Sequence, residues 1–180
     1  MRRRAEKYIP TYTYSEWLHW EERGELIEGA PIPKNTRIGP KHEKAVADFK
    51  TAFTTALAKV DIKNCNVGEP IDYKIANDII LRPDVFIVCG KINKTYLDFP
   101  PVIIVEVISK ATEERDRGIK FESYEKHGVK YYLIADAMKK SVEIYLLADG
   151  KYQPETYKGD FEFDLGSNYK LSVQLGNVFL

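Results

Sequence analysis

Residues 100–110 read PPVIIVEVISK, and the architecture of the chain follows from this run. Proline is tolerated where a strand begins, and a continuous apolar run of this length is typical of a strand covered on both faces. Successive side chains of a strand alternate between its faces, so Glu106 shares a face with Ile104 and Ile108. A buried carboxylate costs several kcal/mol unless a cation, hydrogen bonds or a metal offset it. The run therefore predicts a partner for Glu106.

The segments around this strand predict a sheet flanked by helices. Apolar residues recur at helical period over 41–59, and a second helix is expected from Thr112, a suitable N-cap residue, to His127, before Gly128. Further strands are predicted at 85–89, 131–135 and 142–147, and two short strands within 63–76. The expected fold class is mixed α/β (α+β), with a central mixed sheet.

The ends of the chain extend this core. A capping box formed by Thr13 and Glu16 predicts a short helix that ends near Arg23, and ELIEG followed by API predicts a hairpin that turns at Gly29. We expect one domain over residues 1–180. It comprises a helix and hairpin extension (1–40), a core (41–148) and C-terminal strands (149–180).

Composition narrows the classes of function. The 27 basic residues balance 27 acidic ones, so the chain lacks the overall positive field of proteins that bind nucleic acid without sequence preference. Any DNA binding must rely on local patches. Two candidates are Arg2, Arg3 and Arg4, and the segment 110–140, where eight Lys or Arg accompany six Asp or Glu.

The cysteine spacing and the short apolar runs indicate an intracellular protein. Cys65 and Cys89 do not form a CxxC pair, and no histidine shows metal-ligand spacing to them, so neither zinc nor a disulfide is expected. No apolar run approaches the length of roughly 18 residues that a membrane span needs. We expect a cytoplasmic location.

Acidic residues recur where the predicted strands and the second helix meet. Asp84 begins the strand before Glu106, and Asp116, Lys120 and Tyr124 are spaced by four along the helix. Lys120 could form a buried ion pair with Glu106 or Asp84, with no catalysis. A functional site is equally compatible with this spacing, because two carboxylates suffice for Mg²⁺ or Mn²⁺, which can activate water to hydrolyse a phosphodiester.

Three stretches carry a resemblance to a known family: RPDVFIV at 82–88, residues 100–136 from PPVIIVEVISK to YYLIAD, and VEIYLL at 142–147. With YSEWL and ELIEG near the N-terminus, the chain resembles the Uma-two family of restriction-endonuclease-like proteins, a branch of the PD-(D/E)XK nuclease superfamily. The resemblance covers nearly the whole chain. It implies a restriction-endonuclease-like fold and a metal-dependent endodeoxyribonuclease.

The resemblance also implies roles for single residues. Asp84 and Glu106 are the two acids that bind Mg²⁺ or Mn²⁺. The lysine usually found two residues after the second acid is replaced by Ile108, and Lys120 on the following helix matches the displaced lysine of this family. Lys110 is the alternative.

A further acid of the site is less well defined. Glu25 in ELIEG is the more family-like match and Glu43 is the alternative. His42, Asp116 and Tyr124 are possible accessory residues, although His42 could equally satisfy a helix end and Tyr124 could simply pack. The implied substrate is DNA. We expect a homodimer, because cutting both strands of a duplex favours paired sites. The rival hypothesis is a non-catalytic module of the same fold that binds nucleic acid or a protein partner.

Overall fold

The computed structural model describes residues 10–21, 24–33, 39–60, 62–68 and 70–179. Its elements are, in chain order, α1 (Tyr14–Trp17), β1 (Glu25–Ile27), β2 (Ala30–Ile32), α2 (Pro40–Leu57), β3 (Cys65–Val67), β4 (Tyr73–Lys74), β5 (Ile80–Leu81), β6 (Val85–Cys89), β7 (Ile103–Ile108), α3 (Glu113–Arg117), α4 (Ile119–Lys126), β8 (Tyr131–Asp136), β9 (Ser141–Ala148), β10 (Lys151–Glu155), β11 (Asp160–Gly166), β12 (Tyr169–Gln174) and the 3₁₀ helix η1 (Leu175–Asn177). The mixed α+β fold is confirmed.

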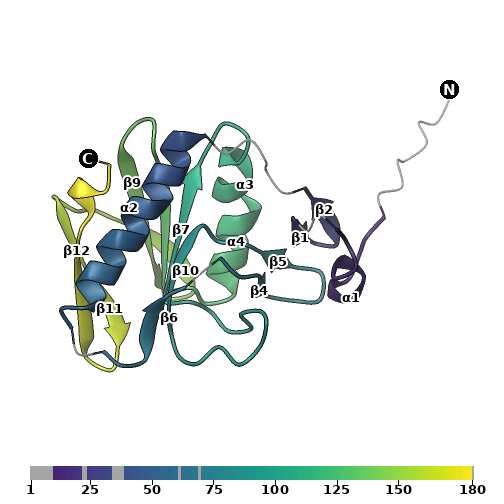
Figure 1. The fold of residues 1–180 in the computed structure, drawn as a ribbon, viewed down its shortest axis with the longest axis horizontal. Coiled ribbons are helices and arrows are strands. Elements are labelled where there is room, and N and C mark those ends of the chain that lie inside the picture. The colour runs from purple at the N-terminus through teal and green to yellow at the C-terminus, as the bar shows by residue number, and fades with distance from the viewer. Residues whose placement is uncertain (1–9, 22–23, 34–38, 61, 69, 180) are drawn as a thin grey trace.

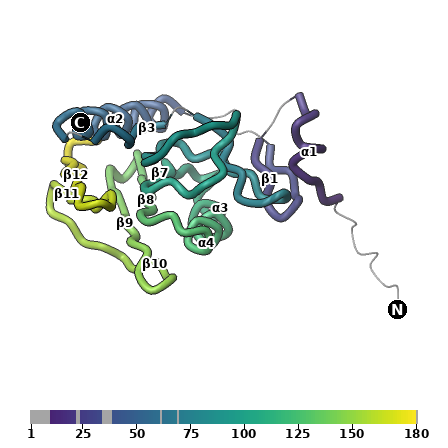
Figure 2. Tube along the Cα trace, turned by 90° about the horizontal axis from the view of Figure 1, so that it is seen from below, coloured from purple at the N-terminus to yellow at the C-terminus, as the bar shows by residue number. Residues whose placement is uncertain are grey.

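A six-stranded sheet forms the centre of the molecule, in the order β10-β9-β8-β7-β6-β3. Only β7 and β8 run parallel within it, and every other pair is antiparallel, so the sheet is mixed as predicted. Helix α2 covers one face and α3 with α4 cover the other (Figures 1 and 2). A four-stranded sheet, β2-β1-β5-β4, and the β11-β12 pair flank this arrangement.

Strand β7 is buried along its whole length, as its apolar sequence requires. Ile103, Val105 and Val107 pack into the core under α2, whereas Ile104 and Ile108 pack into the core under α4. The predicted alternation is therefore confirmed, and it directs Glu106 toward α4.

The second predicted helix is interrupted. Residues 112–127 form two helices, α3 and α4, because the chain breaks at Gly118. A Cβ atom at Gly118 would lie 2.9 Å from the carbonyl oxygen of Glu114, so the break needs a residue without a side chain. The helical spacing of apolar residues did not predict this break. The end of α4 before Gly128, which has φ 81°, is as predicted.

The N-terminal extension contains the predicted hairpin of β1 and β2. Glu28 and Gly29 both have positive φ at its turn, which is the geometry of a type I′ connection. Helix α1 is shorter than expected, and its predicted end at Arg23 lies outside the described residues, as do Arg2, Arg3 and Arg4. No helix in the described part of the chain is long and apolar enough to cross a membrane.

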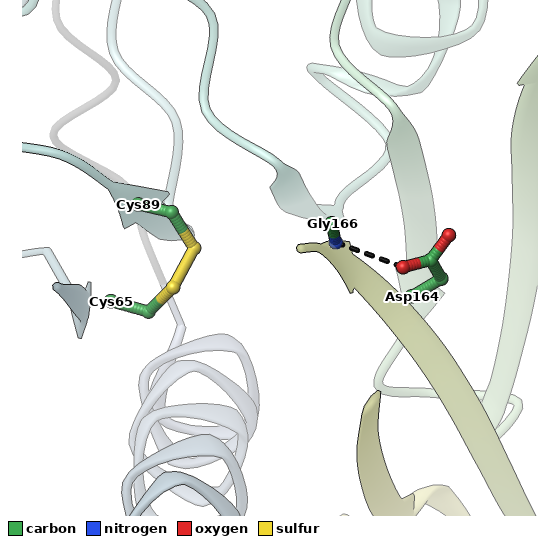
Figure 3. The surroundings of a disulfide bond; sticks show 4 residues. All are labelled: Cys65, Cys89, Asp164 and Gly166. Carbon is green, nitrogen blue, oxygen red and sulfur yellow. Dashed lines mark hydrogen bonds between the residues drawn. A yellow bond between two sulfur atoms is a disulfide. The ribbon is translucent and has the colours of Figure 1, made fainter. Parts of the chain in front are cut away.

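The prediction that the cysteines stay unpaired is wrong. Cys65 in β3 and Cys89 in β6 form a disulfide, with 4.0 Å between their Cα atoms (Figure 3). The two residues are direct partners in the antiparallel register of β3 and β6. Sequence spacing does not contain this register, so the pairing was not foreseen.

Candidate active site

A cavity of about 380 Å³ opens where the six-stranded sheet, α2, α3 and the N-terminal hairpin meet. Its lining is rich in charge. The acids are Glu25, Glu43, Asp84, Glu106 and Asp116, and the bases are His42, Arg82, Arg115 and Lys120. Acidic side chains therefore outnumber Lys and Arg in its wall by two.

The two strands β6 and β7 set the positions of Asp84 and Glu106. Val85 pairs with Val105, so continuing this register places Asp84 opposite Glu106. The Oδ2 atom of Asp84 accepts a hydrogen bond from the backbone N–H of Val107, at 2.8 Å. Two carboxylates are thereby fixed side by side at one end of adjacent strands.

Lys120 is the central cation of the site. Its Nζ atom lies 2.5 Å from Oε1 of Glu106, 3.0 Å from Oε1 of Glu25 and 3.6 Å from Oδ1 of Asp116. Burial opposes the charge on Lys120, but the surrounding carboxylates outweigh that effect and raise its pKa. Lys120 is therefore a permanent ammonium group within three carboxylates.

Glu106 has a second partner in Tyr124. The phenol O–H donates to Oε1 of Glu106 at 2.8 Å, and both groups are buried. Burial is the main reason why the pKa of Glu106 is raised, and the attraction of Lys120 opposes that shift. Burial and the charge of Glu106 also raise the pKa of Tyr124, which keeps its phenol protonated as a donor.

Glu25, the first residue of β1, joins the hairpin to the site. Its Oε1 atom accepts the backbone N–H of Arg82 at 3.0 Å and also contacts Lys120, while its Oε2 atom lies 3.4 Å from Nε of Arg115. The side chain thus connects β1 with the residues before β6 and with both helices, α3 and α4.

His42 lies in the first turn of α2, beside Asp84. The Nε2 atom of His42 is 3.6 Å from Oδ1 of Asp84. Burial lowers the tendency of His42 to charge, yet Asp84 and the carbonyl group of Val107 outweigh it, so that its pKa is raised. His42 can therefore supply positive charge next to Asp84 near neutral pH.

Helix α3 holds Asp116 and Arg115 at the cavity, and the sheet anchors it at two points. The hydroxyl of Tyr132 donates to the backbone carbonyl of Asp116 at 2.8 Å. Arg117 donates two hydrogen bonds to Glu143 of β9, at 2.9 and 2.6 Å. Burial raises the pKa of Asp116, and the charge of Lys120 opposes this.

The structure brings most of the residues singled out from the sequence to one place. Of the candidate catalytic, metal and accessory residues, all line the cavity except Tyr124, which contacts Glu106 from behind. Between the alternatives, Lys120 is at the cavity whereas Lys110 is exposed outside it, and Glu25 is buried whereas Glu43 is exposed. The roles of these residues remain predictions.

Sequence reasoning missed Arg82 and Arg115, which also line the cavity. Arg82 follows β5, a two-residue strand too short to be recognised. Arg115 precedes Asp116, but a single continuous helix would have turned it away from Lys120. The signal that could have identified it is Gly118, the residue at which the helix breaks.

The donor set fits a hard divalent cation. Tyr124 and Lys120 both contact Oε1 of Glu106, so its Oε2 atom has no hydrogen-bond partner among the described residues. Asp84 and Glu106 offer carboxylate oxygens, and Mg²⁺ commonly takes one or two such ligands and keeps several waters. Within the described ranges, no three His, Cys, Asp or Glu side chains converge as a preformed metal centre.

Comparison with known proteins yields a family match over most of the chain. The family model Uma2, described as "Putative restriction endonuclease", matches residues 11–173. The uncharacterized protein slr1290 of Synechocystis sp. is 27% identical over 147 residues, which span 76% of this chain and 75% of that protein.

A solved structure shares the fold. It is the crystal structure of a putative nuclease belonging to DUF820 from Anabaena variabilis, with a TM-score of 0.70 and 17% sequence identity. The superposition covers 93% of this chain and 99% of the other. At this level of identity the likeness concerns the fold alone.

Proposed function

The chain belongs to the Uma2 family, described as "Putative restriction endonuclease", and from this premise we propose that it is a metal-dependent endodeoxyribonuclease that hydrolyses phosphodiester bonds of DNA. The observation that carries the proposal is the pairing of Asp84 with Glu106 on adjacent strands, beside buried Lys120, in a cavity whose wall holds an excess of carboxylates. Such an excess of carboxylates favours the binding of a cation. The positive charge of the bound cation would in turn attract a phosphodiester of the DNA.

Asp84 and Glu106 would hold Mg²⁺ or Mn²⁺ through Oδ1, which lies 3.6 Å from Nε2 of His42, and through Oε2, which makes no hydrogen bond within the described ranges. Once bound, the ion would polarise a phosphoryl oxygen and make a water molecule more acidic. Lys120 is held as an ammonium by Glu25, Glu106 and Asp116, so it would orient the attacking water and offset charge that develops on the phosphate.

Glu25 has a positioning role in this proposal. Both of its carboxylate oxygens already contact donors of the protein, from Arg82, Lys120 and Arg115. The side chain therefore fixes Lys120 relative to β6, and it would complete the metal shell only by giving up one of these contacts.

The rim of the site offers charge for the DNA backbone. Strands β7 and β8 run parallel, so the loops that follow them leave the same edge of the sheet. Exposed lysines lie in those loops and at the start of α2: Lys41, Lys110, Lys139 and Lys140. A duplex laid across this edge would bring its phosphates to these lysines and one phosphodiester to the cavity. We further propose a homodimer, because two sites related by twofold symmetry can cut both strands.

The test is cleavage of supercoiled plasmid in the presence of Mg²⁺, Mn²⁺ or a chelator. The native protein should nick or linearise the plasmid only with metal, and Asp84→Asn and Glu106→Gln should abolish cleavage. Asp149→Asn and Glu122→Gln replace exposed acids outside the cavity and serve as matched controls. If the native protein binds DNA but never cuts it, the non-catalytic binding module is the correct alternative. If both site variants still cut, Asp84 and Glu106 are not the catalytic acids.

A further inference from the structure

We infer that Arg115 is a phosphate-binding residue that donates hydrogen bonds to the DNA backbone inside the cavity. The inference rests on the proposed function and adds a substrate contact to it. Arg115 belongs to α3 and lines the same cavity as Asp84, Glu106 and Lys120. Its side chain is 23% exposed, so the guanidinium is partly accessible from that space.

The guanidinium of Arg115 makes no hydrogen bond to the residues that the structure describes. Its Nε atom is buried, yet it makes no hydrogen bond to any described residue. The nearest anion is Oε2 of Glu25, at 3.4 Å, which forms an ion pair without a well-formed hydrogen bond. A buried donor without an acceptor is costly, so this side chain is suited to an additional oxygen ligand.

Glu25 orients Arg115 but does not accept hydrogen bonds from its N–H donors. The other oxygen of Glu25 is already shared by the Arg82 N–H and by Lys120, so only Oε2 faces the guanidinium. One fixed carboxylate oxygen can orient the five N–H donors of an arginine but leaves most of them open. The planar fork of a guanidinium matches two oxygens of a phosphate, which makes a phosphodiester the fitting ligand.

Arg117, two residues further along α3, shows the opposite state. It donates to both oxygens of Glu143 and, through Nε, to Glu113 at 3.1 Å. Its guanidinium therefore serves to attach α3 to β9. The two arginines of one short helix thus divide their roles, and only Arg115 keeps donors for a ligand at the cavity.

DNA binding by protein that cannot cleave tests this inference. Fluorescence anisotropy with a short labelled duplex compares Asp84→Asn with Asp84→Asn carrying Arg115→Met, at several salt concentrations. Loss of a charge-assisted phosphate contact should weaken binding about tenfold or more and make the salt slope shallower by about one. Lys126→Met in the same background removes an exposed charge outside the cavity and should leave binding nearly unchanged.

A second variant separates binding from folding. Arg115→Lys keeps the charge beside Glu25 but loses the planar fork, so it should fold as the native protein does and recover only part of the affinity. If Arg115→Met and Arg115→Lys both bind the duplex as the parent does, the inference is overturned. It is also overturned if the parent binds no DNA.

The cleavage assay keeps the two proposals apart. A native protein that cuts DNA, with Arg115→Met cutting equally well at the same kcat and KM, would refute the role of Arg115 and leave the nuclease proposal intact. A native protein that never cuts would refute the nuclease proposal, whereas the anisotropy comparison would still decide whether Arg115 binds phosphate.

Discussion

The Nζ atom of Lys120 lies 2.5 Å from Oε1 of Glu106, and both side chains are almost fully buried, at 2% and 3% exposure. Lys120 is the partner that the run PPVIIVEVISK predicts for Glu106. Lys120 and the hydroxyl of Tyr124 share one oxygen of Glu106, which leaves its other oxygen for a further ligand. The protein itself thus supplies two partners for the buried side chain of Glu106.

Lys120→Met should strongly destabilise the fold. The substitution leaves Glu25, Glu106 and Asp116 buried without their common cation, and removal of one partner of a buried ion pair costs about 3–5 kcal/mol. Urea unfolding would measure the loss. Lys126→Met, on the exposed end of α4, is the matched control and should change the free energy of unfolding by less than about 0.5 kcal/mol. Equal stabilities for the two variants would contradict the central role of Lys120.

Tyr124→Phe should also reduce stability, by about 1.5–3 kcal/mol, because a buried carboxylate loses a hydrogen-bond donor. Tyr169→Phe removes a hydroxyl from a tyrosine that is 42% exposed and should be neutral. Unfolding of both variants in urea gives the comparison, and a neutral Tyr124→Phe would show that the hydroxyl does not support Glu106.

His42 should make stability depend on pH. Its pKa is raised above 6.5 in the folded protein by Asp84 and the Val107 carbonyl, against the effect of burial. The folded state therefore binds this proton more tightly, so the stabilisation is complete below the pKa of the unfolded chain and disappears as pH rises through the folded pKa.

The native protein should exceed His42→Gln in free energy of unfolding by more at about pH 5.5 than at about pH 8.5. Urea titrations at the two pH values measure this difference. A gap between native and His42→Gln that is the same at both pH values would rule out the Asp84 interaction as its cause.

The disulfide should contribute about 3 kcal/mol, the loss of loop-closure entropy expected for a crosslink across 24 residues. Reductant should lower the free energy of unfolding of the native protein by this amount and leave a Cys65→Ser, Cys89→Ser double variant unchanged. If reductant leaves the free energy of unfolding of the native protein unchanged while its two thiols become reactive, the bond does not stabilise the fold. An intact protein that contains two free thiols would show that the bond does not form.

Loss of exposed lysines at the sheet edge should weaken DNA binding without changing its sequence preference. Lys110→Ala with Lys140→Ala removes two proposed phosphate contacts, so the salt slope should fall by about two. Lys59→Ala with Lys63→Ala removes two exposed lysines beyond the other end of α2 and is the control. If the native protein and both double variants show the same salt dependence of DNA binding, the DNA does not lie along this edge of the sheet.

Local patterns predicted the elements that carry the site. Strand alternation directed Glu106 toward α4, and helical spacing placed Lys120 and Tyr124 on the face of α4 that meets Glu106, because both depend only on backbone geometry. Asp116 lies on the other side of the break at Gly118 and still contacts Lys120. Asp84 was found for the same reason, since it directly precedes an apolar strand.

Features that depend on long-range register could not be predicted. The Cys65–Cys89 disulfide follows from which residues of β3 and β6 face each other, and Glu25 reaches Lys120 only because β1 pairs with β5. Arg115 was not predicted as a site residue, because the sequence predicts one helix where Gly118 separates α3 from α4. Each depends on a tertiary contact or a single backbone break that hydrophobic period does not record.

Mn²⁺ titration calorimetry, with the native protein and Asp84→Asn, tests the proposed metal site most directly. An asparagine can still accept the hydrogen bond from Val107, so the variant should keep the strand geometry while it loses one anionic ligand. The native protein should bind Mn²⁺ and the variant should bind far more weakly. If neither binds, even with DNA present, or if both bind equally, Asp84 and Glu106 do not form a metal site.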